Sequence, residues 1–299
     1  MATDLKIPVS SAKPAQEFND PLYLRIRDVI YQISGIYHAD DKMYLLSAAC
    51  LRRMGSLNMS SPREYHDLLT SSAMRDTELR SLLNEITIGE TCLFRSQPQL
   101  DALRSVILPQ LIEAKTKLGY RRLRIWSAGC STGEEPYTLA MTLMEEKEKI
   151  LKGWTFEIVA TDLNDRSVET AKAGIYGDYA VRNTSEYFKK KYMQAAPGNK
   201  LQVRDEVKAT ISFSRLNLSD QSKMLFMKGM DLIFCCNVLI YFDGASKRRV
   251  VQHFYANLLP GGYFFLGHSE SLFQVNEDFR LVHFPGATGY RKVVPGMGA

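Results

Sequence analysis

The segment Ile125-Trp-Ser-Ala-Gly-Cys-Ser-Thr-Gly-Glu-Glu-Pro-Tyr137 has the pattern of a buried strand, a loop of small residues and the start of a helix. Pro136 fits the first turn of that helix, where the amide hydrogen that proline lacks would be unpaired anyway. Gly129 and Gly133 leave room for a ligand against the backbone at the carboxyl end of the strand, where open α/β sheets bind ligands. The segment therefore predicts a ligand-binding loop in a doubly wound fold.

Two acidic residues, Glu134 and Glu135, follow the last glycine of this loop. A P-loop requires Gly-Lys-Ser/Thr at this point, and the dinucleotide fingerprint GxGxxG is also missing, so ATP and dinucleotides are disfavoured. S-adenosylmethionine has no phosphate and carries a sulfonium and an ammonium group, which suit an acidic pair. Alternatively, both carboxylates only favour the helix N-terminus through its dipole, and the pair alone does not separate the two interpretations.

Asp162, in Val159-Ala-Thr-Asp-Leu-Asn164, adds weight to the cofactor interpretation. It follows the second predicted strand, where a carboxylate can accept hydrogen bonds from both ribose hydroxyls of an adenosine. Capping the helix that begins near Arg166 is the alternative role, and one carboxylate can serve both. Together with the acidic pair, Asp162 favours S-adenosylmethionine as the cofactor.

Short apolar segments alternate with helical patterns over residues 119–295, which predicts a doubly wound, mostly parallel α/β sheet. Seven predicted strands that end in a hairpin are typical of the methyltransferase variant of this fold. Residues 175–208 are too long for a crossover loop, so they predict a small insertion with β character. The predicted strands are 123–126, 156–160, 210–214, 231–236, 262–266, 279–284 and 289–294, and the predicted helices are 98–117, 135–149, 166–173 and 245–259.

The chain has 299 residues, enough for one α/β domain and a smaller companion. Apolar positions at helical spacing predict an N-terminal helical domain at 21–85, followed by a linker and connecting helix at 86–118. Residues 1–20 lack an apolar core, which predicts a disordered leader and not a secretory signal. No stretch has the apolar run that a bilayer span needs, so direct membrane insertion is not expected.

The cysteines and the net charge narrow the expected partners. The five cysteines form no CxxC pair and have no histidines at zinc spacing, so no metal site is predicted and a cytoplasmic location is expected. The formal net charge of +5 is modest, and residues 189–191 form the only tight lysine run, which suits a solvated helix end. A nucleic-acid partner is therefore not expected.

Several segments, in the same order and at similar spacing, resemble the chemotaxis-receptor glutamate O-methyltransferase (CheR) family. They are the segment 126–137, Ala160-Thr-Asp162, Asn237-Val-Leu-Ile-Tyr-Phe-Asp243 and Gly267-His-Ser-Glu-Ser271. The likeness runs from about residue 22 to residue 294 and includes the helical domain and the insertion. It implies an enzyme that transfers a methyl group from S-adenosylmethionine to glutamate carboxylates of methyl-accepting chemotaxis receptors. The implied products are glutamate methyl esters and S-adenosylhomocysteine.

The resemblance also assigns roles to individual residues. It places Arg95 and Tyr241 at the methyl-transfer end; without it, Arg95 would be interpreted as an interdomain salt-bridge residue and Tyr241 as a half-buried aromatic. Because a glutamate carboxylate is ionised at neutral pH, no general base is required. We expect Arg95 to orient the carboxylate or nearby charge and Tyr241 to donate to an oxygen. The cofactor contacts implied by the resemblance are Thr91, Arg95, Glu135, Asp162, Asn217, Leu218, Asn237 and Val238.

Four positions depart from the family pattern. Gly89 stands where many members have asparagine, Leu93 where they have phenylalanine, and Cys236 where they have arginine beside the active strand. We expect Cys236, like its neighbour Cys235, to pack in the central strand as a small apolar group. In the helical domain Ala49 replaces a common arginine. Part of a basic face similar to the receptor-docking surface remains at Lys42, Arg52 and Arg53.

Two alternative functions stay open. One is a methyltransferase of the same fold that acts on a small molecule or RNA; the basic face at Lys42, Arg52 and Arg53 suits an acidic helical protein better than a small metabolite. The other is an S-adenosylmethionine-binding regulatory module with weak catalysis, which Gly89 and Cys236 would favour and the retained Arg95 and Tyr241 disfavour.

Overall fold

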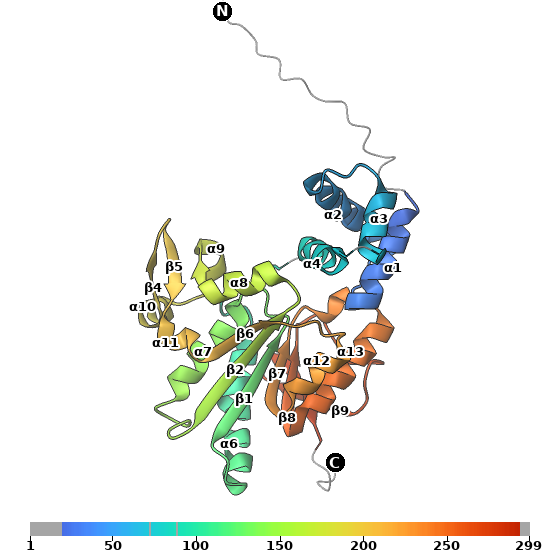
Figure 1. Cartoon of the computed structure of the whole chain (residues 1–299). Coiled ribbons are helices and arrows are strands. Elements are labelled where there is room, and N and C mark those ends of the chain that lie inside the picture. The colour runs from blue at the N-terminus through green and yellow to red at the C-terminus, as the bar shows by residue number, and fades with distance from the viewer. Residues whose placement is uncertain (1–19, 72, 88, 294–299) are drawn as a thin grey trace, which may run out of the picture. The chain divides into compact units, whose positions relative to one another are not determined.

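The computed structural model describes residues 20–71, 73–87 and 89–293 (Figure 1). The chain divides into two units. The first consists of the chain up to Gln32 together with His38–Ile86. The second consists of the short segment Ile33–Tyr37 and the chain from Thr87 onward. Most of the expected leader at 1–20 lies outside the described residues. None of the helices in the described part of the chain combines the length and the apolar character that a bilayer span requires.

The first unit is all helical, as predicted. Apolar side chains at helical spacing are buried between its helices, including Ile26, Leu46 and Leu82. The helices are α1 (Leu22–Ser34, whose end from Ile33 belongs to the other unit), the short 3-10 helix η2 (Asp40–Lys42), α2 (Met43–Ser56), α3 (Pro62–Ser71) and α4 (Arg75–Ile86).

The expected basic face of this unit is only partly present. Nε and Nη2 of Arg53 donate to the two oxygens of Glu78 at 2.9 and 2.8 Å, and only 15% of the Arg53 side chain is exposed. Tyr65 donates to the same carboxylate at 2.8 Å. The prediction that Arg53 belongs to an open docking face is wrong, because its charge is neutralised inside the helical unit. Lys42 is exposed, and Arg52 is 57% exposed although it pairs with Glu85.

The second unit is built on a seven-stranded sheet. Along the order β6-β2-β1-β7-β8 each pair of neighbours is parallel, and β10 runs antiparallel to both β8 and β9. This confirms the predicted doubly wound, mostly parallel sheet with a closing hairpin. The strands are β1 (Arg122–Ala128), β2 (Thr155–Asp162), β6 (Ile211–Arg215), β7 (Met230–Cys235), β8 (Leu258–Leu266), β9 (Phe279–Phe284) and β10 (Ala287–Lys292).

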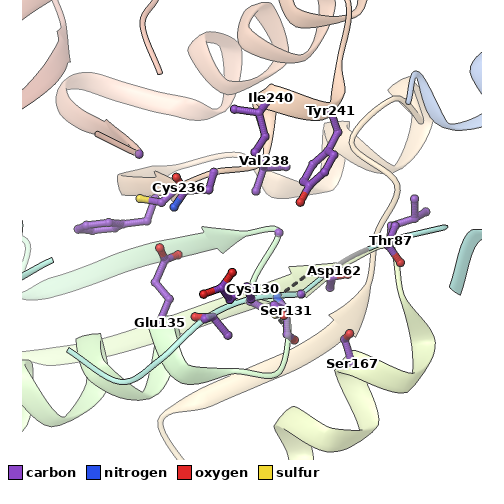
Figure 2. Close-up of a pocket in the computed structure, with 18 of the residues that line it drawn as sticks. Thr87, Cys130, Ser131, Glu135, Asp162, Ser167, Cys236, Val238, Ile240 and Tyr241 are labelled. Carbon is purple, nitrogen blue, oxygen red and sulfur yellow. Dashed lines mark hydrogen bonds between the residues drawn. The ribbon is translucent and has the colours of Figure 1, made fainter. Parts of the chain in front are cut away.

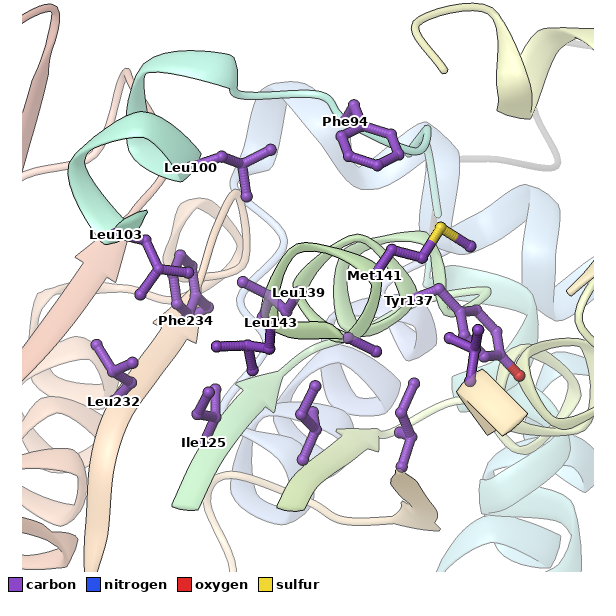
Figure 3. Close-up of a cluster of buried hydrophobic side chains, with 14 of the residues drawn as sticks. Phe94, Leu100, Leu103, Ile125, Tyr137, Leu139, Met141, Leu143, Leu232 and Phe234 are labelled. Atoms are coloured by element: carbon purple, nitrogen blue, oxygen red, sulfur yellow. The ribbon is translucent and has the colours of Figure 1, made fainter. Parts of the chain in front are cut away.

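Alternating side chains of the central strands supply two separate apolar cores, one on each face of the sheet. On β1, Ile125 joins one core and Trp126 the other, because successive strand residues point to opposite faces. Figure 3 shows the first core, in which Ile125 and Leu232 lie near Leu139 and Leu143 of the helix α7 (Glu134–Glu146). The second core includes residues of α13 (Gly244–Asn257), and the short helices α12 (Gln221–Met224) and η4 (Leu225–Met227) contribute methionines to it.

Three of the predicted helices differ from the observed ones in continuity or length. The stretch predicted as one helix at 98–117 consists of α5 (Gln97–Ala102), a π-helical turn (Leu103–Ile107) and α6 (Leu108–Lys117). Proline at 109 lacks the amide that a regular helix would use there. The helix predicted at 135–149 ends at Glu146. The helix predicted at 245–259 ends at Asn257, because Leu258 already pairs with β7, and the Pro260-Gly-Gly segment lies inside β8 instead of ending the helix.

The insertion has the predicted β character. Its strands form a separate antiparallel sheet in the order β3-β5-β4, and Figure 1 shows its elements gathered together beyond β2 and α7. The lysines 189–191 lie in the last turn of one of its helices. After α8 (Asp165–Ala173), the elements are β3 (Ile175–Tyr176), α9 (Asp178–Val181), α10 (Glu186–Tyr192), β4 (Met193–Ala196), β5 (Lys200–Val203) and α11 (Asp205–Lys208).

Candidate functional site

A cavity of about 490 Å³ lies in the second unit, at the carboxyl ends of β1, β2 and β7 (Figure 2). Open α/β sheets bind ligands at the carboxyl ends of their strands. Its size falls in the range of small-molecule sites. All the cofactor contacts and methyl-transfer residues that the resemblance implies line this cavity: Thr91, Arg95, Glu135, Asp162, Asn217, Leu218, Asn237, Val238 and Tyr241.

The loop after β1 approaches its neighbours so closely that only small residues fit. Gly129 has a φ of 76°, and a Cβ there would lie 2.4 Å from Cγ2 of Val238. The amides of Gly129 and Cys130 donate to the carbonyl of Thr161 at 2.7 and 2.9 Å, which ties the loop to β2. Ser131 follows with a φ of 49°. Contacts within the protein therefore fix the backbone of this loop.

Asp162 is held by backbone amides on both sides. Its Oδ2 accepts from the amide of Ser131 and its Oδ1 from the amide of Asn164, each at 2.8 Å. Burial raises the pKa of Asp162, and these amides partly offset the increase. The expected alternative role as helix cap is wrong, since Asn164 is the N-cap of α8 and accepts from the amide of Ser167 at 3.1 Å.

Only one member of the acidic pair faces the cavity. Glu135 points into it and accepts from the Ser127 hydroxyl at 2.7 Å (Figure 2). Glu134 is buried elsewhere, accepts from Thr132 at 2.7 Å and lines a separate hollow, because consecutive helix residues do not share a face. The expectation that both carboxylates line the cofactor cavity is therefore wrong for Glu134. Burial raises the pKa of Glu135, whereas its hydrogen bonds and the charge of Arg95 lower it.

The segment before α5 carries Thr91 and Arg95 to the cavity. Arg95 is exposed, and its Nη1 donates to the carbonyl of Glu90 at 2.8 Å. Phe94, with a φ of 55°, donates its amide to the Thr138 hydroxyl at 2.9 Å. Strained backbone of this kind is characteristic of functional sites.

The departure at Gly89 has a local structural consequence. A Cβ at this position would lie 2.3 Å from the hydroxyl oxygen of Ser131. That oxygen is buried and has no hydrogen-bond partner within the described part of the chain. The space that an asparagine side chain would enter is therefore occupied by the Ser131 hydroxyl.

The loop after β7 supplies Asn237, Val238 and Tyr241. Asn237 has a φ of 59°, and the short helix η5 (Leu239–Tyr241) follows. The side chain of Tyr241 is partly exposed, and Figure 2 shows its hydroxyl directed into the cavity. Burial raises the pKa of Tyr241, although the charge of Arg95 lowers it. Tyr241 therefore carries a neutral hydroxyl, a hydrogen-bond donor, at neutral pH.

Asn217 and Leu218 lie in the loop after β6. The Asn217 side chain donates to the carbonyl of Ile33 at 2.6 Å and accepts from the amide of Ser219 at 3.0 Å. Leu218 is buried in the second apolar core at 7% exposure. Both residues line the cavity, but the Asn217 side chain is already used to hold its own loop.

Cys236 lies one residue past the strand and packs against the first apolar core, so the expected apolar packing is confirmed, although its place inside the strand is not. The strand ends at Cys235, and Cys236 is only half-buried and lines the cavity, with its thiol 3.8 Å from Oε1 of Gln99. Burial and the nearby carboxylate of Glu135 hold the pKa of this thiol well above its usual range. Cys235 is fully buried in the second core, as expected.

Four residues that sequence reasoning gave no role also shape the site. Ser127 orients Glu135, and Asn164 donates to the Thr87 hydroxyl at 2.8 Å. Gln99 donates to the carbonyl of Leu266 at 2.7 Å. Glu270 accepts from backbone amides of the loop after β7. Glu270 lies in a motif that the family shares, whereas no pattern in the sequence points to Gln99.

The charges of the cavity fit a cationic ligand without phosphates. Among the described lining residues, Glu90, Glu135 and Asp162 carry carboxylates, and only Arg95 carries a permanent positive charge. The described residues contain no group of acidic, histidine and cysteine side chains placed to hold a metal ion. This cavity on this sheet defines the class of the protein as an S-adenosylmethionine-dependent methyltransferase.

Comparison with known proteins gives the family. The model described as "CheR methyltransferase, SAM binding domain" matches residues 89–287, and "CheR methyltransferase, all-alpha domain" matches residues 21–87. The chain therefore belongs to the CheR methyltransferase family. It is 34% identical over 273 residues to "Chemotaxis protein methyltransferase 2" of Vibrio cholerae, a match that covers 91% of this chain and 93% of the relative. It is also 32% identical over 267 residues to "Chemotaxis protein methyltransferase" of Escherichia coli, covering 88% of each chain.

Proposed function

We propose that this methyltransferase esterifies glutamate side chains in the cytoplasmic domains of methyl-accepting chemotaxis receptors, in the cytoplasm. Its family membership and the names of its relatives support this proposal. The observation that carries it is the joint presence of Arg95 and Tyr241 in a cavity that also contains Asp162 and Glu135. An anionic substrate would meet a guanidinium and a phenol there, while the carboxylates serve the cofactor.

The cofactor would be held mainly by the two buried carboxylates. Asp162, fixed by two amides, would accept from the ribose hydroxyls, and Glu135 would attract the ammonium group. The other predicted contacts are Thr91, Arg95, Asn217, Leu218, Asn237 and Val238. When bound, S-adenosylmethionine supplies an electrophilic methyl group on a positively charged sulfur.

The residues of the chain have little proton chemistry to perform in this reaction. A glutamate carboxylate is ionised at neutral pH, with an ordinary pKa of about 4.3, so it needs no base. Arg95 would orient the substrate carboxylate, and the neutral Tyr241 hydroxyl would donate to one of its oxygens. Alignment and exclusion of water are then the main contributions of the protein.

We also propose that the helical unit contacts the receptor. Lys42 and Arg52 remain exposed on this unit, and both would suit acidic helices of a receptor. Arg53 takes no part in this proposal, because it is paired with Glu78.

Transfer of radiolabelled methyl groups to purified receptor cytoplasmic domains tests the proposal. Label released as methanol by alkali would identify a carboxyl ester. We expect Arg95→Ala to lower turnover by about 100-fold and Tyr241→Phe by about 10-fold, because both align the substrate. The matched control is Arg280→Ala, because Arg280 is an exposed arginine on β9 that does not line the cavity.

Near-normal rates in both cavity variants would contradict the proposed roles. Calorimetric binding of S-adenosylmethionine without transfer to any receptor would instead support a regulatory binding module, and transfer only to RNA or a small molecule would support the other alternative.

A further inference from the structure

The loop after β7 needs an anchor to hold its shape. Asn237 begins it in the left-handed region, with a φ of 59°, which asparagine adopts more readily than most residues but less readily than glycine. Val238 and Tyr241, which follow, both line the cavity. A loop of this kind keeps one conformation only when its surroundings fix it.

One carboxylate provides that anchor. Oε2 of Glu270 accepts from the amide of Asn237 at 2.6 Å and from the amide of Gly267 at 2.8 Å. Oε1 accepts from the amide of Ile240 at 3.3 Å. Glu270 itself follows β8, in a turn closed by its amide and the carbonyl of Gly267 at 3.0 Å. The side chain therefore connects the ends of two neighbouring strands.

The packing around this carboxylate is tight on the side of Gly267. A Cβ at Gly267 would lie 2.5 Å from Oδ1 of Asn237 and 2.8 Å from Oε2 of Glu270. Glu270 is not among the residues that line the cavity, whereas Gly267 and His268 are. Both of its oxygens are engaged by backbone amides, so it is placed to shape the loop and not to touch a substrate.

We infer that Glu270 is a positioning residue for methyl transfer: by binding the amides of Asn237 and Ile240 it sets the loop that presents Tyr241 to the substrate. This inference rests on the proposed function, since it assigns Tyr241 a part in catalysis. The cofactor carboxylates Asp162 and Glu135 lie on other elements and are held by other bonds. Asn237 and Val238, two of the predicted cofactor contacts, also lie on this loop, so loss of the Glu270 anchor should weaken cofactor binding slightly and lower turnover much more.

The test compares Glu270→Gln, Glu270→Asp and the matched control Glu277→Gln. Glu277 is exposed and, like Glu270, lies between β8 and β9. A carboxamide has one accepting oxygen, and its amino group opposes a backbone amide, so it cannot accept from all three donors. We expect Glu270→Gln to lower kcat by about 10- to 100-fold, since small displacements of aligned groups have effects of this order. KM for S-adenosylmethionine should change by less than about 3-fold, and Glu270→Asp, which keeps the charge, should restore part of kcat.

Hydrogen exchange of the peptide 236–243 is measured on the same variants, because it needs neither substrate nor turnover. Faster exchange at Asn237 and Ile240 in Glu270→Gln, with unchanged exchange in Glu277→Gln, supports the anchor. Unchanged exchange, an unchanged kcat, or a loss of cofactor affinity as large as the loss of turnover would each overturn the inference. If the glutamine variant does not fold, Glu270→Asp decides by the same measurements. If wild-type protein methylates no receptor, the proposed function fails, and the exchange result still decides whether Glu270 holds the loop.

Discussion

The two ends of the cavity are built in different ways. At the cofactor end, Asp162 and Glu135 are held by bonds to residues near them in the sheet, from the amide of Ser131 and from the hydroxyl of Ser127. At the proposed methyl-transfer end, Arg95 is exposed in the segment before α5, and Tyr241 is 36% exposed at the end of the short helix η5. The proposed cofactor end thus lies at the carboxyl ends of the strands, whereas the proposed transfer end lies outside the sheet and depends on other segments to hold it.

The Arg95 segment illustrates this dependence, because the insertion holds it. The amide of Leu93 donates to the carbonyl of Ala180 at 2.9 Å, and the ring of Phe94 lies 4.6 Å from that of Phe188. Further contacts join the same two parts of the chain, Tyr179 to Glu90 at 2.8 Å and Asn183 to Cys92 at 3.5 Å. The insertion therefore contributes to the site even though it supplies no residue that was predicted to bind or react.

The largest effect, on cofactor affinity, should follow from removing the Asp162 carboxylate at the proposed cofactor end. Asp162→Ala would remove the proposed ribose acceptor and leave the amides of Ser131 and Asn164 without their partner. Hydrogen bonds to charged groups contribute about 1.5–3 kcal/mol each, so we expect cofactor affinity to fall by about 100-fold or more. Calorimetry with S-adenosylmethionine measures it, with Asp205→Ala, at an aspartate that is 97% exposed, as the control. A change of less than about 3-fold would mean that Asp162 only shapes the loop.

An intermediate effect on turnover is expected when a contact between the Arg95 segment and the insertion is removed. Phe188→Ala would remove the ring that packs on Phe94, next to Arg95. We expect turnover to fall by about 10-fold, because misplaced substrate-orienting groups lower the rate, while cofactor affinity stays within about 2-fold. Steady-state kinetics and calorimetry measure the two quantities, and Phe226→Ala, at a side chain that is 84% exposed, is the control. Equal losses of turnover and affinity would contradict a separation between the two ends.

The fold was largely predictable because its signals are local. Buried strands such as β7 (Met230–Cys235) are short, mostly apolar runs, and the small residues from Gly129 to Gly133 mark the loop that follows β1. Helix boundaries were less accurate, since they depend on pairing: Leu258 joins β8 because Met230 lies beside it, which no local pattern indicates.

The site was predictable only in part, for the same reason. Which side chains line the cavity followed from family motifs, whereas the partners that hold them arise from contacts distant in sequence. Gln99 donates a hydrogen bond to the carbonyl of Leu266. In the helical unit, Arg53 pairs with Glu78, and little of its side chain is exposed. Glu134 faces away from Glu135 because of helix geometry, which the acidic pair in the sequence does not reveal.

The smallest effect should come from a change of pH, which acts on the two carboxylates of the proposed cofactor end. Burial raises the pKa of Glu135, so this carboxylate takes up a proton at a higher pH than an ordinary glutamate. A protonated Glu135 no longer attracts an ammonium group, so cofactor affinity should be highest above the raised pKa and should fall as the pH drops through it. We expect the affinity to decrease by several-fold on acidification from neutral pH, and Glu135→Gln to bind more weakly at neutral pH with a flatter profile. Any pH dependence of the affinity that remains in that variant would come from Asp162, because burial also raises the pKa of Asp162. Calorimetric titrations over this pH range, with folding checked at each point, measure both slopes, and an affinity that rises on acidification would show that Glu135 does not face a cation.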